Sequence, residues 1–367
     1  MSVLTAIGLM SGTSLDGVDV ALIETDGEEV KRLGPTGYRS YSSEEQDILR
    51  RALADSSNLK DRRARPGILV DAEDIVTSAH KNAVEEFVFK NGIGKNDVAI
   101  VGFHGQTVLH RPSEHLTVQI GNGPELAKQI AVPVAYDFRA ADVAAGGEGA
   151  PLVPAYHRAL ARKLKVRAPI VIVNIGGVAN VTYLDGDADP IAFDTGPGNA
   201  PIDDLMLARA GQRADFEGSF ASRGRIDEEI LQRVLGDPFF SRKPPKSLDR
   251  ATFAKFSLES LSNEDAAATA TAIVAGSIAN ALKLLPKKPS TVVAVGGGAK
   301  NPTLMSMLQG HIGTPITSAS DVGWEVDAME AQAFAYLAVR TLKGLPLTFP
   351  TTTGVKKPLS GGVIAKP

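Results

Sequence analysis

The segment AFDTGPGN, residues 192–199, contains the side chain in this sequence that is the clearest candidate for taking part in a reaction. Asp194 ends an apolar run and is followed by two glycines and a proline, so its carboxylate is expected at a strand end beside a tight turn. One interpretation is that Asp194 caps a loop, and the other is that its carboxylate does chemistry. Gly196 and Gly198 would leave backbone room for a ligand beside it.

A second candidate site is a small-residue turn between two apolar segments near the N-terminus. Backbone N–H groups and hydroxyls in such a turn can bind phosphate oxygens, because small side chains let the backbone approach closely. The turn lacks the GK[ST] ending of a P-loop. Carboxylates in it could hold the Mg²⁺ of a nucleotide, directly or through water. The residues are Gly12, Thr13, Ser14, Leu15, Asp16, Gly17, Val18 and Asp19.

The same strand–turn–strand pattern recurs in the second half of the chain, where APIVIVNIGG is followed by VANVTYLDGD. Each turn alone is more simply explained as structural, but two in equivalent positions favour phosphate binding. The second turn offers Gly176, Gly177 and Asn180. A third turn follows the strand TVVAV, where a flat ligand can lie at the carboxyl end of the strand. It consists of Gly296, Gly297 and Gly298.

Polar side chains also gather where further strands are expected to end. Amides and hydroxyls suit a polyhydroxylated ligand, although ordinary solvation of loops explains them about equally well. An Arg at 139 could bind a carboxylate through two N–H groups or pair with Asp137. Glu330 lies in the segment AMEAQAFAYLA, among side chains that are mostly small or apolar, so its carboxylate needs a partner or a ligand. The candidates are His104, as an orienting group rather than a base, with Gln106, Thr107, Gln119, Asn122, Arg139, Asp142 and Glu330.

The composition indicates a soluble globular protein of 367 residues, long enough for two domains. The net charge of -3 gives no reason to expect a nucleic acid or an anionic membrane as partner. The absence of cysteine excludes disulfides and thiolate sites. No secretory signal is recognisable, and the apolar stretches fall short of the roughly 20 residues of a membrane helix, so a cytoplasmic protein is expected.

The order of the expected elements predicts the fold class. Strands arrive as hairpins followed by helices, which indicates α/β units with mixed sheets. A helix is expected to begin at Ser42, with a capping box of Ser42 and Glu45, and further helices are expected over 68–90, 153–163, 264–284 and 326–342. The stretch PFFSRKPPKSLDR, beginning at Pro238, is expected to be an irregular loop.

Several segments in this order resemble the anhydro-N-acetylmuramic acid kinase family. They span nearly the whole chain and are GLMSGTSLDGVDVAL, GFHGQTVLHRP, QIGN, DFRAADVAAGGEGAPLVPAYH, NIGGVANVTYL, FDTGPGN and GGGAKNPTLM. The chain departs from the family pattern PKSTGRE at Leu248–Asp249, and it has Glu148 where glutamine is frequent.

The resemblance implies two actin-like, ribonuclease H-like ATPase domains that flank a central cleft. We expect an N-terminal domain over residues 1–165, a C-terminal domain over 166–325, and a helix and tail over 326–367 that pack back across the domains. The implied cofactors are ATP and Mg²⁺, and the implied partner is a small amino sugar. A homodimer is left open as the assembly.

The implied activity opens the 1,6-anhydro ring of 1,6-anhydro-N-acetylmuramic acid with water and phosphorylates O6, in the recycling of cell-wall sugars. By the same resemblance, the turn 12–19 binds ATP and Asp194 activates the water. Asp16 of that turn is the candidate for holding the metal, directly or through water. Thr107 and Glu330 would contact the sugar, and the turn 296–298 would lie at the adenosine. Two alternatives stay open, namely a conventional hydroxyl kinase for another amino sugar and a non-enzymatic actin-like ATPase.

Overall fold

The protein is described by a computed structural model that covers residues 2–12, 14–248 and 257–367. The chain divides into two compact units. The first consists of Met1–Lys163 together with Asp327–Pro367, and the second is the continuous segment Leu164–Val326. The last helix and the C-terminal tail therefore belong to the first unit, so that both ends of the chain build it.

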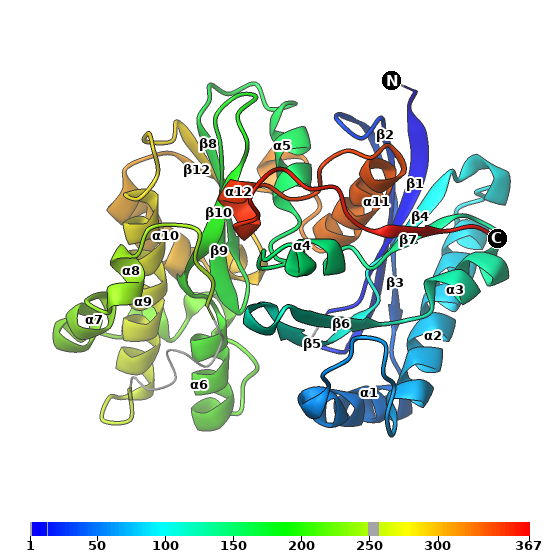
Figure 1. Ribbon diagram of the computed structural model, residues 1–367. Coiled ribbons are helices and arrows are strands. Elements are labelled where there is room, and N and C mark those ends of the chain that lie inside the picture. Colours follow the sequence, from blue (N-terminus) through cyan, green and yellow to red (C-terminus); the bar gives the residue numbers. More distant parts are fainter. Residues whose placement is uncertain (1, 13, 249–256) are drawn as a thin grey trace. The chain divides into compact units, whose positions relative to one another are not determined.

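The first unit is built on a six-stranded mixed sheet with the order β13-β7-β4-β1-β2-β3 (Figure 1). Antiparallel hairpins join β1 to β2 and β2 to β3, whereas β4 is parallel to both β1 and β7. The strands of this sheet are β1 Leu4–Met10, β2 Gly17–Thr25, β3 Val30–Ser40, β4 Ile100–Phe103, β7 Val134–Tyr136 and β13 Val363–Ala365. A separate antiparallel hairpin consists of β5 Gln106–Arg111 and β6 Leu116–Ile120.

The second unit repeats this topology in a five-stranded sheet with the order β10-β9-β8-β11-β12. Its first three strands are antiparallel neighbours, and β11 is parallel to both β8 and β12. The strands are β8 Ile170–Ile175, β9 Val178–Leu184, β10 Ile191–Pro197, β11 Thr291–Val295 and β12 Ile316–Ser318. The α/β class with two mixed sheets is thus confirmed. The central cleft that the family resemblance implies stays a prediction.

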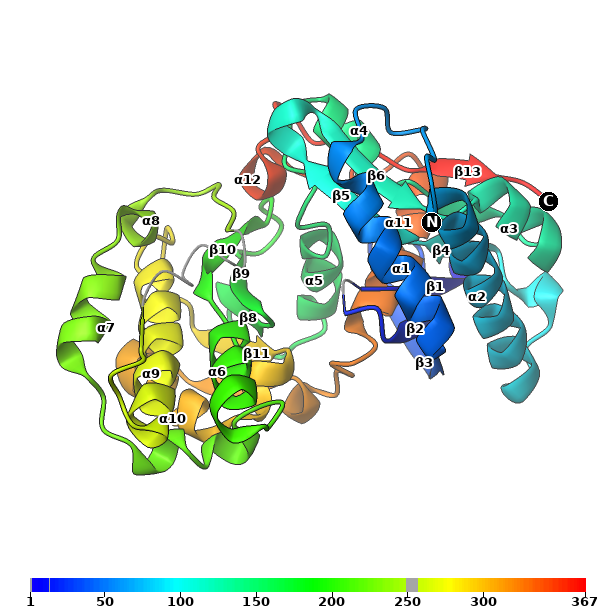
Figure 2. The same cartoon turned by 90° about the horizontal axis from the view of Figure 1, so that it is seen from below.

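Helices cover both faces of the first sheet, with α2 and α3 on one side and α11 on the other (Figures 1 and 2). The capping box of Ser42 and Glu45 is present at the start of α1, as predicted. The helices of this unit are α1 Ser43–Asp55, α2 Leu69–Lys90, α3 Gly123–Ile130, α4 Ala140–Ala144, α5 Pro154–Ala161, α11 Met329–Leu342 and α12 Pro350–Thr353.

The core of the second unit is centred on α9, an alanine-rich helix that packs against α6, α10 and the strands β9 and β10. By length and composition α9 could cross a membrane, contrary to the expectation that no stretch is long enough, but 83% of its apolar window is buried inside the protein. The helices of this unit are α6 Ala200–Ala210, α7 Glu228–Leu235, α8 Pro238–Ser241, α9 Asn263–Leu282 and α10 Pro302–Ile312.

Helix α11 lies unusually close to the first sheet at two glycines that face each other in register, Gly8 of β1 and Gly102 of β4. A Cβ added at Gly8 would lie 1.8 Å from the carbonyl oxygen of Ala331, and one at Gly102 would lie 2.1 Å from that of Phe334. Only glycine permits this approach of helix backbone to strand backbone. The two glycines therefore set the position of the helix that begins beside Glu330.

Two elements were not foreseen, and two sequence predictions need correction. The strand β5 after His104 and the short helix α4 were not expected from the sequence. The segment expected to be irregular begins with the short helix α8, whose start is capped by the side chain of Asp237. Asp194 does not end its strand, because β10 continues to Pro197 through a register shift between Asp194 and Gly196.

Candidate functional site

A pocket of about 500 Å³ in the first unit collects most of the polar candidates. Its walls come from the turn after β1, the start of the β5 hairpin, the segment before α4 and the first turn of α11. The predicted residues that line it are Gly12, Ser14, His104, Gln106, Thr107, Arg139 and Glu330. Sequence reasoning missed Met10, Ser11, His110 and Ala150, which line it as well.

The buried side chain of Gln106 holds the backbone at the start of the N-terminal turn. Its Oε1 accepts a hydrogen bond of 2.6 Å from the hydroxyl of Ser11, and its Nε2 donates to the carbonyl of Gly12 over 3.1 Å. Both ends of the amide are therefore engaged with protein atoms. In this geometry Gln106 holds the turn in place, and a ligand in the pocket would contact that turn.

The turn is tight, and several of its residues can offer a ligand only their backbone groups. Leu15 has a positive φ of 56°, and its N–H donates to the carbonyl of Gly12. The side chains of Leu15 and Val18 are buried in the core, so only their backbone can reach a ligand. A Cβ at Gly17 would lie 2.4 Å from the carbonyl of Arg39, which explains the glycine by packing. Thr13 lies outside the described residues.

His104 links this turn to Arg139. Its Nδ1 lies 3.2 Å from the carbonyl oxygen of Ser11 and its Nε2 lies 3.1 Å from Nη2 of Arg139. A carbonyl can only accept and a guanidinium can only donate, so Nδ1 carries the proton and Nε2 accepts. Burial, with the nearby charge of Arg139, lowers the pKa of His104 to about 3. His104 is therefore a neutral orienting group.

Arg139 and Glu330 place opposite charges in the pocket. Burial lowers the pKa of Arg139, and the charges of Glu330 and Asp142 act against that effect. Part of the Glu330 side chain is exposed within the pocket, but the surrounding protein displaces enough water to raise the pKa of its carboxyl, against the attraction of Arg139. A partly desolvated guanidinium and carboxyl in one pocket suit a ligand rich in hydroxyl groups.

A concentration of negative charge lies beside the turn. Burial, with the neighbouring charges of Asp16, Glu330 and Asp327 acting in the same direction, raises the pKa of Asp19 to about 6. A cation would relieve this repulsion. Among the described residues no three His, Cys, Asp or Glu side chains are close enough to form a metal cage. The donor set fits Mg²⁺ held by one or two carboxylates together with water and phosphate oxygens.

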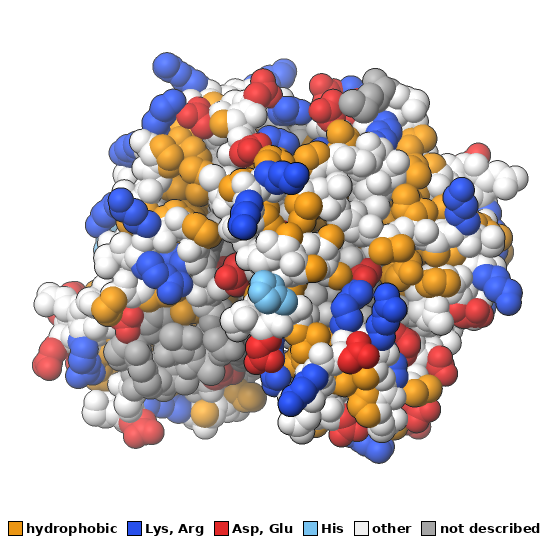
Figure 3. All heavy atoms as spheres, viewed as in Figure 1, with side chains coloured by type: hydrophobic (Ala, Val, Ile, Leu, Met, Phe, Trp, Pro, Cys, Tyr) orange, Lys and Arg blue, Asp and Glu red, His pale blue; other side chains and the backbone are white. Residues whose placement is uncertain are grey.

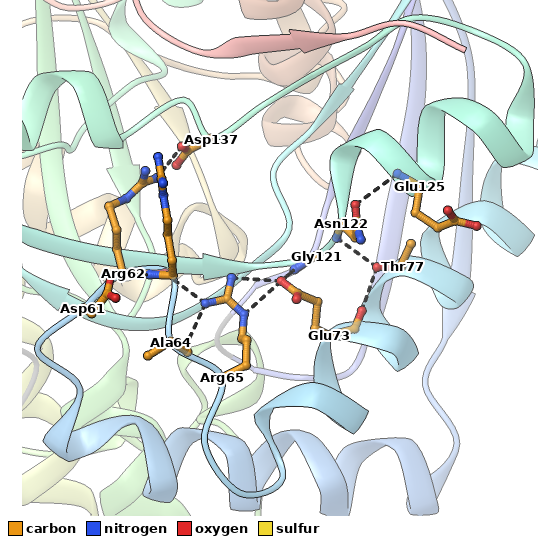
Figure 4. A network of polar contacts seen from close by, with 11 residues as sticks. Asp61, Arg62, Ala64, Arg65, Glu73, Thr77, Gly121, Asn122, Glu125 and Asp137 are labelled. Carbon is orange, nitrogen blue, oxygen red and sulfur yellow. Dashed lines mark hydrogen bonds and ion pairs between the residues drawn. The ribbon is translucent and has the colours of Figure 1, made fainter.

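Three further candidates lie outside this pocket and have protein partners. Gln119 lines a second cavity of about 370 Å³. The same cavity is lined by two ion pairs, of Arg62 with Asp137 and of Arg65 with Glu73, which Figure 4 shows. The Asn122 side chain caps α3 by accepting from the N–H of Glu125 (Figure 4). Asp142 is 2% exposed, and it accepts from the N–H of Gly149 and from the hydroxyl of Thr353. These contacts indicate structural roles for Asn122 and Asp142.

The glycine turns of the second unit pack on one another. The N–H groups of Gly198 and Asn199 donate to the carbonyls of Gly177 and Gly176, over 3.0 and 2.7 Å. A Cβ at Gly198 would lie 2.1 Å from the carbonyl oxygen of Gly176.

The triple-glycine turn joins the same assembly. A Cβ at Gly296 would lie 2.5 Å from Oδ1 of Asn174, and one at Gly298 would lie 2.3 Å from Ile175. The turns 176–177, 198–199 and 296–298 therefore lie together at the ends of β8, β10 and β11. Asn180 is not part of a turn, since it lies inside β9 and pairs in register with both Asn174 and Asp194.

The carboxylate of Asp194 contacts the loop that follows α8. Its Oδ2 accepts a hydrogen bond of 2.8 Å from the N–H of Leu248, and its own N–H donates to the carbonyl of Lys246. The register shift beside Asp194 is the kind of irregularity that re-aims a side chain near a functional site. The sequence predicted an irregular loop here and showed its departure from the family pattern, but these contacts were not foreseen.

Lys246 is a buried cation near Asp194 that sequence reasoning missed. Its Nζ donates to the carbonyl of Phe239 over 2.9 Å and lies 4.4 Å from the centre of that ring. Burial lowers the pKa of Lys246 to about 8, and the charge of Asp194 opposes this shift. A nearby ammonium and a backbone N–H both favour the ionised form of the Asp194 carboxyl.

Comparison with known proteins gives a match along nearly the whole chain. Residues 4–367 match the family described as anhydro-N-acetylmuramic acid kinase. Proteins of that name from Nitrobacter winogradskyi and Bradyrhizobium diazoefficiens are 58% and 56% identical to the chain over 365 residues. These alignments cover 99% of this chain and 100% of each relative.

Solved structures give weaker similarities. Component A of the Acidaminococcus fermentans (R)-2-hydroxyglutaryl-CoA dehydratase is 12% identical, with a TM-score of 0.49, over 93% of this chain and 99% of that one. A xyloylose kinase from Brucella ovis is 10% identical, with a TM-score of 0.48, over 99% of this chain and 94% of that one. Similarity at this level carries no argument about function, and the fold assignment rests on the strand order of the two sheets.

Proposed function

The chain belongs to the anhydro-N-acetylmuramic acid kinase family, and from that premise we propose how its residues carry out the reaction. The enzyme opens the 1,6-anhydro ring of 1,6-anhydro-N-acetylmuramic acid with water and transfers the γ-phosphoryl group of ATP to O6. The products are N-acetylmuramic acid 6-phosphate and ADP. The observation that carries this proposal is that one pocket joins the turn at Gly12 and Ser14 to Thr107, Arg139 and Glu330.

The amino sugar occupies this pocket in our proposal. Thr107 offers a hydroxyl, Arg139 a guanidinium and Glu330 a carboxyl, which together can bind hydroxyl, carboxylate and amide groups of the sugar. Gln106 and His104 act one step away, because their hydrogen bonds hold the carbonyls of Gly12 and Ser11. The phosphate-binding N–H groups of the turn are thereby oriented by the residues that form the wall of the sugar pocket.

Asp194 serves as the general base in this proposal. Water attacks C1 while the C1–O6 bond breaks, and Asp194 accepts the proton of that water. The base must lie on the face opposite the departing O6, as in inverting glycosidases. O6 begins inside the bridge without a proton, so it can take the phosphoryl group as it leaves, and ADP is released. The contacts of Asp194 with Leu248 and Lys246 support an ionised carboxylate.

ATP is held in this proposal by the glycine-rich turns. In this proposal the turns 12–19 and 176–177 bind the phosphates, and the turn 296–298 binds on the adenosine side. Mg²⁺ bound with ATP supplies charge neutralisation at the phosphates. Asp16 and Asp19 are the carboxylates that would hold it, Asp16 directly or through water, and the raised pKa of Asp19 supports a cation there.

The decisive experiment measures ADP release with the anhydro sugar as the only acceptor, in ¹⁸O-labelled water. We expect sugar-dependent ADP release and label at C1 of the product. A product without label would instead indicate a conventional hydroxyl kinase, and ADP release that does not depend on sugar would indicate an actin-like ATPase. Sedimentation of the purified protein would test the homodimer. We place the enzyme in the cytoplasm, where ATP is available.

A further inference from the structure

The glycine-rich loop 146–149 forms the connection between α4 and the pocket wall at Ala150. Two backbone N–H groups attach this loop to neighbouring segments. The N–H of Gly149 donates to Oδ1 of Asp142 over 2.6 Å, and the N–H of Glu148 donates to the carbonyl of Thr353 over 2.8 Å. A Cβ at Gly147 would lie 2.2 Å from Oδ1 of Asp142, so the loop lies directly against that carboxylate.

Asp142 is in turn held by a residue of the C-terminal tail. The hydroxyl of Thr353 donates to its Oδ2 over 2.7 Å, and this threonine is completely buried. The two oxygens of the Asp142 carboxylate are thus divided between the loop and the tail. Removing the Thr353 hydroxyl would leave a buried carboxylate oxygen without this donor, which is costly for a charged group.

The carbonyl of Gly149 connects this assembly to the pocket. It accepts a hydrogen bond of 2.9 Å from Nη1 of Arg139, whose Nη2 donates to His104. These two bonds fix the plane of the guanidinium, because a fork of donors with two fixed acceptors cannot rotate freely. A shift of Gly149 would therefore reorient the Arg139 guanidinium in the pocket that Glu330 also lines.

We propose that Thr353 is a positioning residue for the sugar pocket, which acts through Asp142 and the loop 146–149 on the orientation of Arg139. This inference rests on the proposed function, since it assumes that Arg139 contacts the sugar. It assigns a role in sugar recognition to the tail, although Thr353 lies 211 residues beyond the side chain that it holds.

The test compares three substitutions at Thr353 with a matched control. Thr353→Val removes the hydroxyl at nearly constant volume, Thr353→Ser keeps it, and Thr353→Cys retains a weak donor. The control is Thr348→Val in the same segment. Thr348 is 2% exposed, and its hydroxyl has no hydrogen-bond partner among the described residues.

Steady-state ADP release is measured against the concentration of anhydro sugar and, separately, of ATP. We expect Thr353→Val to raise the KM for the sugar about tenfold, with the KM for ATP changed by less than about twofold. Thr353→Ser and Thr348→Val should keep wild-type values, and Thr353→Cys should lie between serine and valine. If the valine variant does not fold, the comparison of Thr353→Cys with Thr353→Ser still tests the proposal.

Equal sugar KM values for the folded valine variant and the wild type would overturn the positioning role. An equal rise in both KM values would also overturn it, because general loosening of the unit would then explain the result. A wild-type enzyme that releases no ADP with the sugar would instead overturn the proposed function, so the two failures are distinguishable.

Discussion

The contacts of single residues show how a carboxylate can cap a loop and still be prepared for proton transfer. The Asp194 carboxylate accepts the N–H of Leu248, which fixes the loop after α8. The same hydrogen bond lowers the free energy of the ionised form, and the ammonium of Lys246 does so as well. The two interpretations of Asp194 are therefore compatible, and kinetics must test the catalytic one.

Asp194→Asn is expected to abolish turnover while ATP still binds. The asparagine retains an oxygen that can accept from Leu248 N–H, so the loop should stay in place, but it cannot accept a proton from water. Loss of general-base catalysis should lower kcat by about 10²- to 10⁴-fold. Nucleotide affinity is measured by calorimetry and kcat by ADP release. Near-wild-type kcat in this variant would contradict the assignment of the base.

Asp19 gives a pH-dependent prediction for stability. Its pKa is raised to about 6 in the folded protein, so the folded state holds this proton longer than the unfolded state as pH rises from about 4. The favourable contribution of Asp19 to the free energy of unfolding is fully present below about pH 4 and is lost as pH rises through about 6. Asp19→Asn removes this loss and should unfold at a higher temperature than the wild type at pH 7.5.

The control for this experiment is Glu86→Gln, which removes a negative charge from an exposed position of α2. Thermal unfolding is followed at pH 4 and pH 7.5 for the three proteins without nucleotide. A stability difference between Asp19→Asn and the wild type that does not grow with pH would contradict the raised pKa. We also expect Asp19→Asn to weaken Mg²⁺-dependent ATP binding, so the stabilisation would accompany a loss of function.

At the scale of elements, the packing of α11 on the first sheet decides where the Glu330 carboxyl lies in the pocket. Gly8 and Gly102 allow the helix backbone to approach the strands, and Glu330 is the second residue of that helix. Displacing the helix would move Glu330 away from Arg139. Stability and the proposed sugar pocket are therefore coupled through two glycines that do not line that pocket.

Gly102→Ala should destabilise the first unit and impair sugar binding together. Its methyl group would lie 2.1 Å from the carbonyl oxygen of Phe334, so helix or strand must shift, at a cost of about 1–3 kcal/mol or more. Gly310→Ala in α10 is the control, because its added methyl meets nothing within 4 Å and alanine favours a helix. Urea unfolding measures both variants. A neutral Gly102→Ala would contradict the close packing.

The elements that the sequence predicted best are those with strong local signals. The capping box at Ser42 placed the start of α1, and the Asn91–Gly92 signal after Lys90 helped to place α2 almost to the residue. The repeated hairpins correctly indicated two mixed sheets. The strand β5 was missed because its polar residues resemble a loop, and its pairing with β6 is decided by tertiary contacts.

The site was predictable in residue type but not in role. Thr107, Arg139 and Glu330 do line one pocket with the N-terminal turn. Whether an amide binds a ligand or a backbone carbonyl depends on geometry that no spacing rule contains, as Gln106 and Asn122 illustrate. The buried Lys246 gave no signal, because a lysine in a polar loop is normally exposed.

At the scale of the whole molecule, two sheets of one topology carry different parts of the proposed reaction. The first unit supplies the pocket with Arg139 and Glu330, and the second supplies Asp194 and the clustered glycine turns. Charged side chains of both signs are interspersed over the face shown in Figure 3, in keeping with the net charge of -3.

The second unit should fold when expressed alone as residues 164–326. It is one continuous segment with its own core around α9, whereas residues 1–163 lack α11 and β13. We expect a cooperative thermal transition for the fragment 164–326 and none for 1–163, each followed by far-UV circular dichroism. Adding a peptide of residues 327–367 should restore the transition of 1–163. Cooperative unfolding of 1–163 alone would contradict the dependence on the tail.

The split of the first unit between the two ends of the chain has a consequence for biosynthesis. A ribosome completes the sheet strands β1 to β7 early, but α11, which covers one of their faces, is among the last elements to be translated. For most of the elongation time the nascent chain therefore carries an uncovered apolar surface while the second unit is still being made. Premature termination before Met329 would release a product with that surface permanently exposed, a natural substrate for chaperones and proteases.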